Sequence, residues 1–512
     1  MPKHGSLSDN VVAPNSRFYH GPFGRICPDL DPWRPEGVTD TDLEEHFKRF
    51  ATVSMIEAPN KLPTEIASDE ELRTELDSKF NSSLPAGYTY FGQFIDHDMT
   101  LDTTPLSESE IDPNRLRNFR TPRLDLDCVY GSGPGDQPHL YEHDGNKLTG
   151  RLLTGTIPQT DFLDLPRNSE GRAIIGDMRN DENAIVAQIQ LAFILAHNTL
   201  VDRAFSHGLA ETGEEAFDLA RTTLRWLYQW IVWEDFVKRV TIDEIHACAL
   251  TTKNGCGNRR VWDLGLGDVY SWKYQPFMPV EFSVAAYRFG HTMARNSYQT
   301  NSSVAAGAGF GTFIPLFDVN VAAADDLSGF RPLNAKRVVQ WDWFLQMDSS
   351  QAPFPQFARK IDTKLSNALA HLREDLHDRT ALANILAARN LVRGVRMRLP
   401  SGEDVARKFG LMPIALSTEE PKALWYYVLK EAELLPGNDG GRTLGPLGSI
   451  IVCATFAGLL KGDVRSWLNV QPDWTPDSAA LLKPEDKRDE GNWTLASIIR
   501  LSGLPVDGTS FP

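Results

Sequence analysis

Cysteine is scarce in this sequence, and its spacing matches no common kind of cysteine site. Five cysteines are scattered over the 512 residues, at Cys27, Cys128, Cys248, Cys256 and Cys453. Their odd number and irregular spacing indicate neither a disulfide framework nor a zinc site. We therefore expect these thiols to be reduced.

Basic residues are too few for the chain to bind nucleic acid through charge. The 52 lysines and arginines are outnumbered by 68 aspartates and glutamates, which gives a formal net charge of −16. Such a chain repels nucleic-acid phosphates and offers little to anionic membrane surfaces. We expect neither as a partner.

We expect no membrane span in this chain. The longest uncharged apolar stretch lies between Arg442 and Lys461, and it contains Pro446 and three glycines. This composition predicts a buried core helix instead. No apolar signal region follows Met1, so we expect a cytoplasmic protein, or one exported without a conventional signal peptide.

Strand-like alternation is also missing, whereas helical spacing recurs. We predict a mainly α fold with few or no strands. We expect three parts: an N-terminal arm with short helices (1–84), a central domain (85–470) and a loose C-terminal tail (471–512). Residues 81–87 are expected to form a turn. We expect helices over residues 40–50, after a capping pattern at 68–71, and over 91–100, 184–208, 216–240, 281–297, 381–393, 424–433 and 447–462.

The stretch from Phe91 to Thr100 carries polar groups among aromatic residues. In a helix, Gln93, Asp96 and His97 share one face, whereas Asp98 lies about 100° further round. A titratable cluster on an apolar helix is costly unless something buried uses it. This stretch is therefore the first candidate for a functional site.

A loop further along the chain offers oxygen atoms to a cation. Side chains of Thr121, Asp125 and Asp127 and the carbonyl group of Arg123 present the hard ligands that Ca²⁺ prefers. The alternative is a turn with solvated aspartates, which has the same pattern. Both interpretations stay open on these residues alone.

Other candidate residues have structural alternatives of their own. Arg179 and Glu182 stand three apart at the entrance of the helix over 184–208, where they point into one pocket or form an exposed capping pair. His291 interrupts an apolar stripe, which is more often the position of a hydrogen-bonded core histidine than of a ligand. His197 is expected to be a structural histidine.

The order of these motifs resembles that of the animal-type haem peroxidases, the peroxidase–cyclooxygenase superfamily. The resemblance covers roughly residues 85 to 470. It rests on five motifs in the same order: Gln-x-x-Asp-His-Asp, Thr-x-x-x-Asp-x-Asp before Val-Tyr-Gly, Asp-x-Arg-x-x-Glu-Asn, Arg-Phe-Gly-His-Thr, and an asparagine shortly before Arg-Gly. It implies a b-type haem held between two central helices, together with a calcium ion.

The resemblance implies a role for each candidate residue. His97 matches the distal histidine, which acts as general base and then acid on the peroxide, and Gln93 the glutamine that orders water or halide there. Arg179 matches the distal arginine. His291 matches the axial iron ligand, and Asn390 the residue that accepts a hydrogen bond from its imidazole. The implied calcium ligands are Asp98, Thr121, Arg123 (through its carbonyl oxygen), Asp125 and Asp127.

Some positions differ between members of this family. Asp96 and Glu182 stand where mammalian members form ester bonds to the haem, which makes them candidates for covalent attachment. Asn183 replaces a methionine that makes a third link in one member. Asp127 replaces a more usual serine, and its added negative charge should tighten calcium binding.

The implied function is that of a peroxidase, as a monomer or small homo-oligomer. It would reduce hydrogen peroxide and oxidise halide, thiocyanate or small aromatic donors through a compound I intermediate. A fatty-acid dioxygenase of the same superfamily is the first alternative. Such enzymes carry a radical tyrosine three residues before the proximal histidine, where this chain has Arg288, one of the residues expected to bind the cofactor. Tyr287 is turned about 100° from that position on an α-helix. A non-catalytic, haem-containing structural protein is the second alternative.

Overall fold

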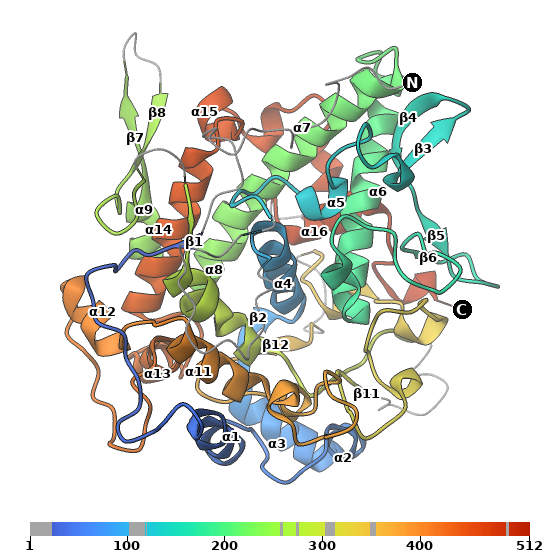
Figure 1. The fold of residues 1–512 in the computed structure, drawn as a ribbon. Helices are drawn as coiled ribbons and strands as arrows, with labels where there is room; N and C mark the ends of the chain where they lie inside the picture. Colours follow the sequence, from blue (N-terminus) through green and yellow to red (C-terminus); the bar gives the residue numbers. More distant parts are fainter. Residues whose placement is uncertain are drawn as a thin grey trace.

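The computed structural model describes residues 23–101, 118, 120–255, 260–272, 276–302, 313–348, 355–487 and 491–511. Within these ranges the chain is mainly helical (Figure 1), which confirms the predicted fold class. The α-helices are α1 (Leu43–Ser54), α2 (Pro63–Ser68), α3 (Glu70–Phe80), α4 (Gly87–Met99), α5 (Asp127–Tyr130), α6 (Ala184–Ser206), α7 (Gly213–Ile231), α8 (Lys238–Val240), α9 (Asp243–Ala249), α11 (Leu386–Arg396), α12 (Gly402–Lys408), α13 (Leu424–Leu434), α14 (Pro446–Gly462), α15 (Trp467–Val470) and α16 (Leu495–Ser502).

The strands of the described residues are short and pair two by two. The parallel pair is β1 (Phe23–Gly24) with β9 (Met278–Pro279). The antiparallel pairs are β2 (Asn81–Pro85) with β12 (Phe357–Arg359), β3 (Tyr141–Asp144) with β4 (Lys147–Leu152), β5 (Gly155–Thr156) with β6 (Leu163–Asp164), β7 (Leu250–Asn254) with β8 (Arg260–Leu264), and β10 (Ser297–Tyr298) with β11 (Ile314–Pro315). The strand β2 lies in the segment for which a turn was expected. The sequence did not reveal this strand because its partner, β12, lies far away in the sequence.

Helix α4 lies near the centre of the molecule (Figure 1). Its aromatic residues pack against α6 and against Tyr228 of α7. Phe94 stacks on Phe193 of α6 with a centroid separation of 4.6 Å. Tyr228 of α7 meets Phe193 edge-on at 5.6 Å. Burying one such ring contributes about 1.5–3 kcal/mol to stability. The apolar side of α4 is thus held in the core, which leaves its polar side for a cavity.

The segment that carries His291 is helical but not an α-helix. A π-helix, η6 (Glu281–Ala285), is followed by a 3₁₀-helix, η7 (Ala286–Met293). Ala285 joins them with φ −126° and ψ −81°, outside the helical region. The prediction of a continuous helix over 281–297 is therefore wrong in its geometry and in its end, because the hydrogen-bond ladder breaks at Ala285.

The last part of the chain is packed and not loose as expected. Helix α16 packs against α6, and its residues Leu495, Ile498 and Ile499 are fully buried. Its eight residues are too few to make a strong periodic pattern, so the sequence does not predict this helix. The division into an arm, a central domain and a tail stays a prediction.

Two apolar helices lie in the core. Helix α14 is buried, as predicted for the uncharged stretch after Arg442. Helix α6 is long and apolar enough to cross a membrane, but 89% of its most apolar window is buried inside the protein. Such burial is typical of the core helix of a globular protein.

His197 on α6 makes folding stability depend on pH. Its Nδ1 lies 3.0 Å from the Tyr130 hydroxyl and its Nε2 lies 2.9 Å from the Gly150 carbonyl oxygen. Burial lowers its pKa to about 4. As pH falls below about 6.5, the unfolded chain binds a proton at this ring that the folded chain does not bind. The stability contributed by neutral His197 is therefore present above that pH and lost toward pH 4.

We expect this loss to reach about 3 kcal/mol, and His197→Gln to remove it from the pH dependence. Urea unfolding of both proteins at pH 7 and pH 4.5 measures the difference. Equal losses of stability in the two proteins would contradict the assignment.

Candidate functional site

A cavity of about 450 Å³ lies between α4, the entrance of α6, and η7. Its wall combines apolar side chains such as Phe236 and Leu316 with polar ones. It brings together candidates that are far apart in the sequence: Gln93, Asp96, His97, Arg179, Glu182, Asn183, Arg288 and His291. The shared face predicted for α4 therefore opens onto this cavity.

A chain of hydrogen bonds orients His97 and determines which ring nitrogen carries the proton. Gln190 donates from Nε2 to the Cys128 carbonyl oxygen at 3.2 Å, so its Oε1 is free to accept. That oxygen accepts from Asn180 Nδ2 at 2.8 Å, and Asn180 Oδ1 then lies 2.7 Å from His97 Nδ1. Because the Asn180 amide nitrogen already donates to Gln190, its Oδ1 can only accept, so Nδ1 of His97 carries the proton and donates it to Asn180. The lone pair is left on Nε2.

His97 is held in its neutral form. Burial lowers its pKa to about 3, and the nearby positive charge of Arg179 acts in the same direction. A neutral imidazole with its lone pair on Nε2 can accept a proton from a ligand and return it.

Arg179 lines the cavity and is fixed by several acceptors. Its Nε donates to Asp177 at 3.1 Å, and its Nη2 donates to the carbonyl oxygens of His97 and Thr100 at 3.0 and 2.6 Å. The hydrogen bond from Arg179 lowers the pKa of Asp177 below its usual range, although burial of that carboxyl group opposes the shift. These hydrogen bonds hold the guanidinium group beside His97.

Gln93 connects two residues at the entrance of α6. Its Nε2 donates to Glu182 at 3.1 Å, and its Oε1 accepts from Asn183 at 3.1 Å. Burial, followed by the charge of Glu374, raises the pKa of Glu182 to about 7. Glu182 therefore lies at the cavity wall and not in an exposed capping pair.

Asp96 is the second carboxyl group in the cavity wall. Burial raises its pKa above the usual range, and its Oδ1 accepts a hydrogen bond of 3.0 Å from the Thr100 hydroxyl. Asp96 and Glu182 thus present two carboxyl groups to one cavity from two different elements. Whether either forms an ester bond stays a prediction.

His291 faces the cavity from the opposite element, η7. Its Nδ1 lies 2.8 Å from Nδ2 of Asn390, whose Oδ1 accepts from Nη1 of Arg288 at 2.7 Å. Because a guanidinium group can only donate, it turns the amide oxygen of Asn390 away from His291. The contact predicted between Asn390 and His291 is present, but the amide nitrogen faces the ring. Burial, followed by the charge of Arg288, lowers the pKa of His291 to about 3.

Tyr287 also lines the cavity, although its position next to Arg288 had placed it on another helix face. Its hydroxyl donates to the Gly92 carbonyl oxygen at 3.1 Å. Tyr287 and Arg288 both lie in the cavity wall, although adjacent side chains of a 3₁₀-helix are about 120° apart.

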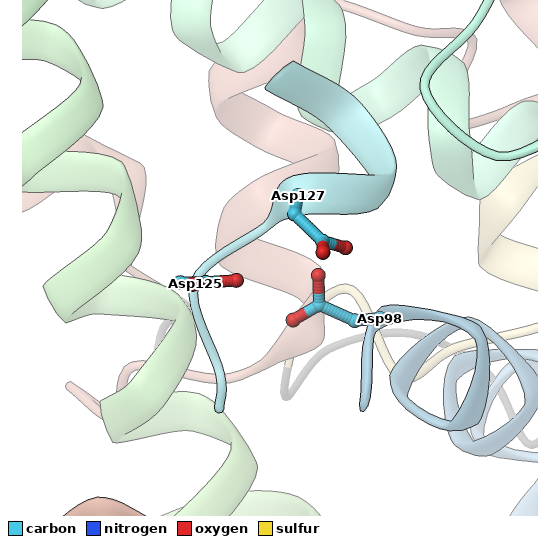
Figure 2. Close-up of side chains that lie close together, drawn as sticks. All are labelled: Asp98, Asp125 and Asp127. Carbon is cyan, nitrogen blue, oxygen red and sulfur yellow. The ribbon is translucent and has the colours of Figure 1, made fainter. Parts of the chain in front are cut away.

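A second site lies on the other side of α4 from the cavity-facing groups. Figure 2 shows Asp98 near the end of α4 facing Asp125, which lies in a loop, and Asp127, which begins α5. All three side chains are buried, and one carboxylate oxygen from each lies within 4.8 Å of the others. The Thr121 hydroxyl lies 2.9 Å from both carboxylate oxygens of Asp125.

These buried carboxylates repel one another. Burial, followed by the charge of Asp125, raises the pKa of Asp98 to about 7, and burial raises that of Asp127 well above its usual range. A divalent cation would relieve this cost, since Ca²⁺ takes carboxylate and hydroxyl oxygens. The backbone amide of Arg123 donates to the Thr121 carbonyl oxygen at 2.7 Å and tightens the loop. The role of the Arg123 carbonyl oxygen as a ligand stays a prediction.

Two routes connect this cluster of aspartates to the cavity. The first is the chain from the Cys128 carbonyl oxygen to His97, since Cys128 directly follows Asp127. The second is a line of alternating charges, in which Arg120 contacts Asp127 at 3.4 Å and Asp177 at 2.8 Å, and Asp177 contacts Arg179 at 2.7 Å. The loop therefore supports both His97 and Arg179.

Sequence reasoning missed Asn180, Gln190 and Arg120. A signal existed for Gln190, because an uncharged polar side chain in the apolar helix α6 needs a buried partner. Asn180 offered no periodic signal, since it lies in the short 3₁₀-helix η3 (Met178–Asp181).

Residues 104–309 match the family model described as animal haem peroxidase. The chain is 26% identical over 267 residues to a "Peroxidase-like protein" of Margaritifera margaritifera, a match that covers 50% of this chain and 32% of that protein. It is 23% identical over 362 residues to "Heme peroxidase 2" of Caenorhabditis elegans, which covers 66% of this chain and 47% of that protein. The chain thus spans less than half the length of either curated relative.

Solved structures share the fold at low sequence identity. Peroxidase A from Dictyostelium discoideum has a TM-score of 0.57 at 16% identity, with coverage of 91% of this chain and 93% of that chain. The fatty acid alpha-dioxygenase of Oryza sativa has a TM-score of 0.51 at 13% identity, with coverage of 93% and 79%. At these identities the likeness concerns the fold alone.

Proposed function

The chain belongs to the animal haem peroxidase superfamily, and on that premise we propose that it is a haem-dependent peroxidase. It would reduce hydrogen peroxide and oxidise a halide, thiocyanate or small aromatic donor. The observation that carries this proposal is a pair of neutral histidines, the buried His97 and the half-buried His291, which face one cavity from different elements.

The residues around the cavity fit a haem. Neutral imidazoles are iron ligands and proton carriers, and the cavity has the size of a small-ligand pocket. Arg288 and Arg389 line it and can bind the two carboxylate groups of haem. When bound, haem supplies the iron through which electrons pass from the donor to the peroxide.

The orientation of the Asn390 amide would depend on which group Arg288 binds. A His291 ring that binds iron through Nε2 carries its proton on Nδ1, and this proton needs an acceptor. A haem carboxylate would give Arg288 another partner, so that Asn390 could turn its Oδ1 toward His291. A neutral asparagine keeps the imidazole less anionic than an aspartate would, which favours a high reduction potential.

His97 would move the proton. Its Nε2 would accept a proton from one peroxide oxygen and return it to the other oxygen, which leaves. Meanwhile Nδ1 would stay hydrogen-bonded to Asn180. Arg179 stabilises the negative charge that develops as the peroxide bond breaks. Gln93, held between Glu182 and Asn183, orders water or halide beside them.

Asn180 gives a test of how His97 is oriented. We expect Asn180→Ala to lower the rate of peroxide reduction by about 10- to 100-fold, because the ring loses the acceptor that fixes its tautomer. Asn180→Asp keeps an oxygen for Nδ1 and should retain more activity. Stopped-flow kinetics measures the rates, and the haem absorption band serves as the control for folding. Equal rates in Asn180→Ala and the unmodified protein would contradict the orientation.

The proposed activity is tested with peroxide and a panel of donors. The purified protein should consume hydrogen peroxide when iodide, thiocyanate or guaiacol is present. Acid–acetone extraction of the haem tests the ester bonds, because a haem that extracts completely has none at Asp96 or Glu182.

A fatty-acid dioxygenase is the second candidate function. The observation in its favour is Tyr287, whose hydroxyl lies in the cavity wall. The dioxygenase function is disfavoured by Arg288, which stands where such enzymes carry the radical tyrosine. Oxygen uptake with linoleate in the absence of peroxide would favour the dioxygenase over the peroxidase.

A further inference from the structure

A second cavity adjoins the first, and a hydrogen bond links a residue in the wall of one to a residue in the wall of the other. Its volume is about 740 Å³, and Trp230, Asp235, Arg239 and Trp493 are part of its lining. Tyr88 lines the first cavity but not the second, whereas Asp235 lines the second but not the first. The Tyr88 hydroxyl donates to Asp235 Oδ2 at 2.6 Å.

The surroundings of Tyr88 are those of a side chain that can lose a proton together with an electron. Both Tyr88 and Asp235 are buried. Asp235 also accepts from Nε of Arg239 and from the amide of Leu495, which hold the carboxylate in place. The guanidinium carbon of Arg239 lies 5.1 Å from the centroid of the Tyr88 ring. A tyrosine that has lost one electron is a strong acid, and the short bond to Asp235 gives its proton an immediate acceptor.

We propose that Tyr88 relays electrons to the haem from a bulky phenolic donor bound in the second cavity. The inference rests on the proposed peroxidase function, which supplies peroxide-oxidised haem as the oxidant. A haem would fill most of the first cavity, so a large donor needs another place. Trp230 and Trp493 give the lining of the second cavity aromatic side chains against which a phenol ring can pack.

Electrons and protons balance when the relay is written as two steps. Tyr88 first gives one electron to the oxidised haem and its hydroxyl proton to Asp235, which leaves a neutral tyrosyl radical and a carboxylic acid. The phenol then gives one electron to Tyr88, which takes its proton back from Asp235. The proton of the phenol passes to water in the second cavity, and a phenoxyl radical leaves. Two phenols are oxidised for each peroxide reduced to water.

The test compares Tyr88→Phe with a matched control, Tyr426→Phe. Tyr426 also donates to a carboxylate, Glu420 at 2.8 Å, but it lines neither cavity. The haem-loaded proteins are mixed with peroxide alone, frozen, and examined by electron paramagnetic resonance. We expect a tyrosyl radical in the unmodified protein and in Tyr426→Phe, and none in Tyr88→Phe. Asp235→Asn, which cannot take the proton, should lack the radical as well.

The second measurement is donor oxidation, with syringaldazine as the bulky phenol and iodide as the small donor. In Tyr88→Phe we expect syringaldazine oxidation to fall by about tenfold or more, while iodide oxidation stays within about twofold. Unchanged syringaldazine oxidation, or an unchanged radical, in Tyr88→Phe overturns the relay. A chain that oxidises neither donor in unmodified form refutes the peroxidase proposal itself, which separates the two failures.

Discussion

Replacing His97 by alanine should lower kcat/KM for hydrogen peroxide by about 10²–10⁴-fold, the usual contribution of a positioned acid–base group. The reason is that Nε2 of His97 is the neutral, lone-pair-bearing nitrogen in the cavity, and Asn180 holds it there. Haem should still bind, because its axial ligand would be His291. Stopped-flow mixing with peroxide measures the rate.

The control for this variant is His246→Gln. His246 is buried and bonded to the Trp233 carbonyl oxygen at 3.0 Å, but it does not line the cavity. It should leave the peroxide rate nearly unchanged. A His97→Ala protein that keeps its haem and reacts as fast as the unmodified protein would falsify the role of His97.

We expect the cluster of Asp98, Asp125 and Asp127 to hold a calcium ion, and removal of this ion to inactivate the protein while its haem stays bound. Asp98, Asp125 and Asp127 repel one another without a cation, and the loop that carries them supports His97 through the Cys128 carbonyl oxygen. We expect Asp98→Asn to lose bound calcium and to lower peroxidase activity by about 10- to 100-fold. Its midpoint of thermal unfolding should fall by several degrees.

Elemental analysis, haem absorbance and activity are measured on the same sample. Asp144→Asn, at an exposed position in β3, is the matched control and should keep its calcium and activity. Chelator-treated protein that holds no calcium and retains full activity would rule out the supporting role of this site.

The polar face of α4 was predictable from the sequence, because α4 is a regular helix. Residues three and four apart share a side in any such helix, so Gln93, Asp96 and His97 open onto one cavity, whereas Asp98 faces Asp125 and Asp127. The same reasoning did not predict that Tyr287 also lines this cavity. Its segment is 3₁₀-helical after a break at Ala285, and spacing in the sequence does not reveal that form.

Hydrogen-bond partners that come from distant elements could not be predicted from the sequence. Asn180 and Gln190 are ten residues apart, and their bond depends on the path of the chain between η3 and α6. Likewise, Tyr88 and Asp235 are separated by 147 positions, and only the fold brings them together. Local periodicity reports which side of a helix is polar, but it does not report what that side will meet.

Titration of the haem-free protein with haemin, followed by its absorption spectrum, tests the central claim that His97 and His291 hold a haem between them. We expect the unmodified chain to take up one equivalent and to develop an intense haem band, and His291→Ala to lose most of this binding. A chain that binds no haem, or a His291→Ala variant that binds it as tightly and with the same spectrum, would contradict the account.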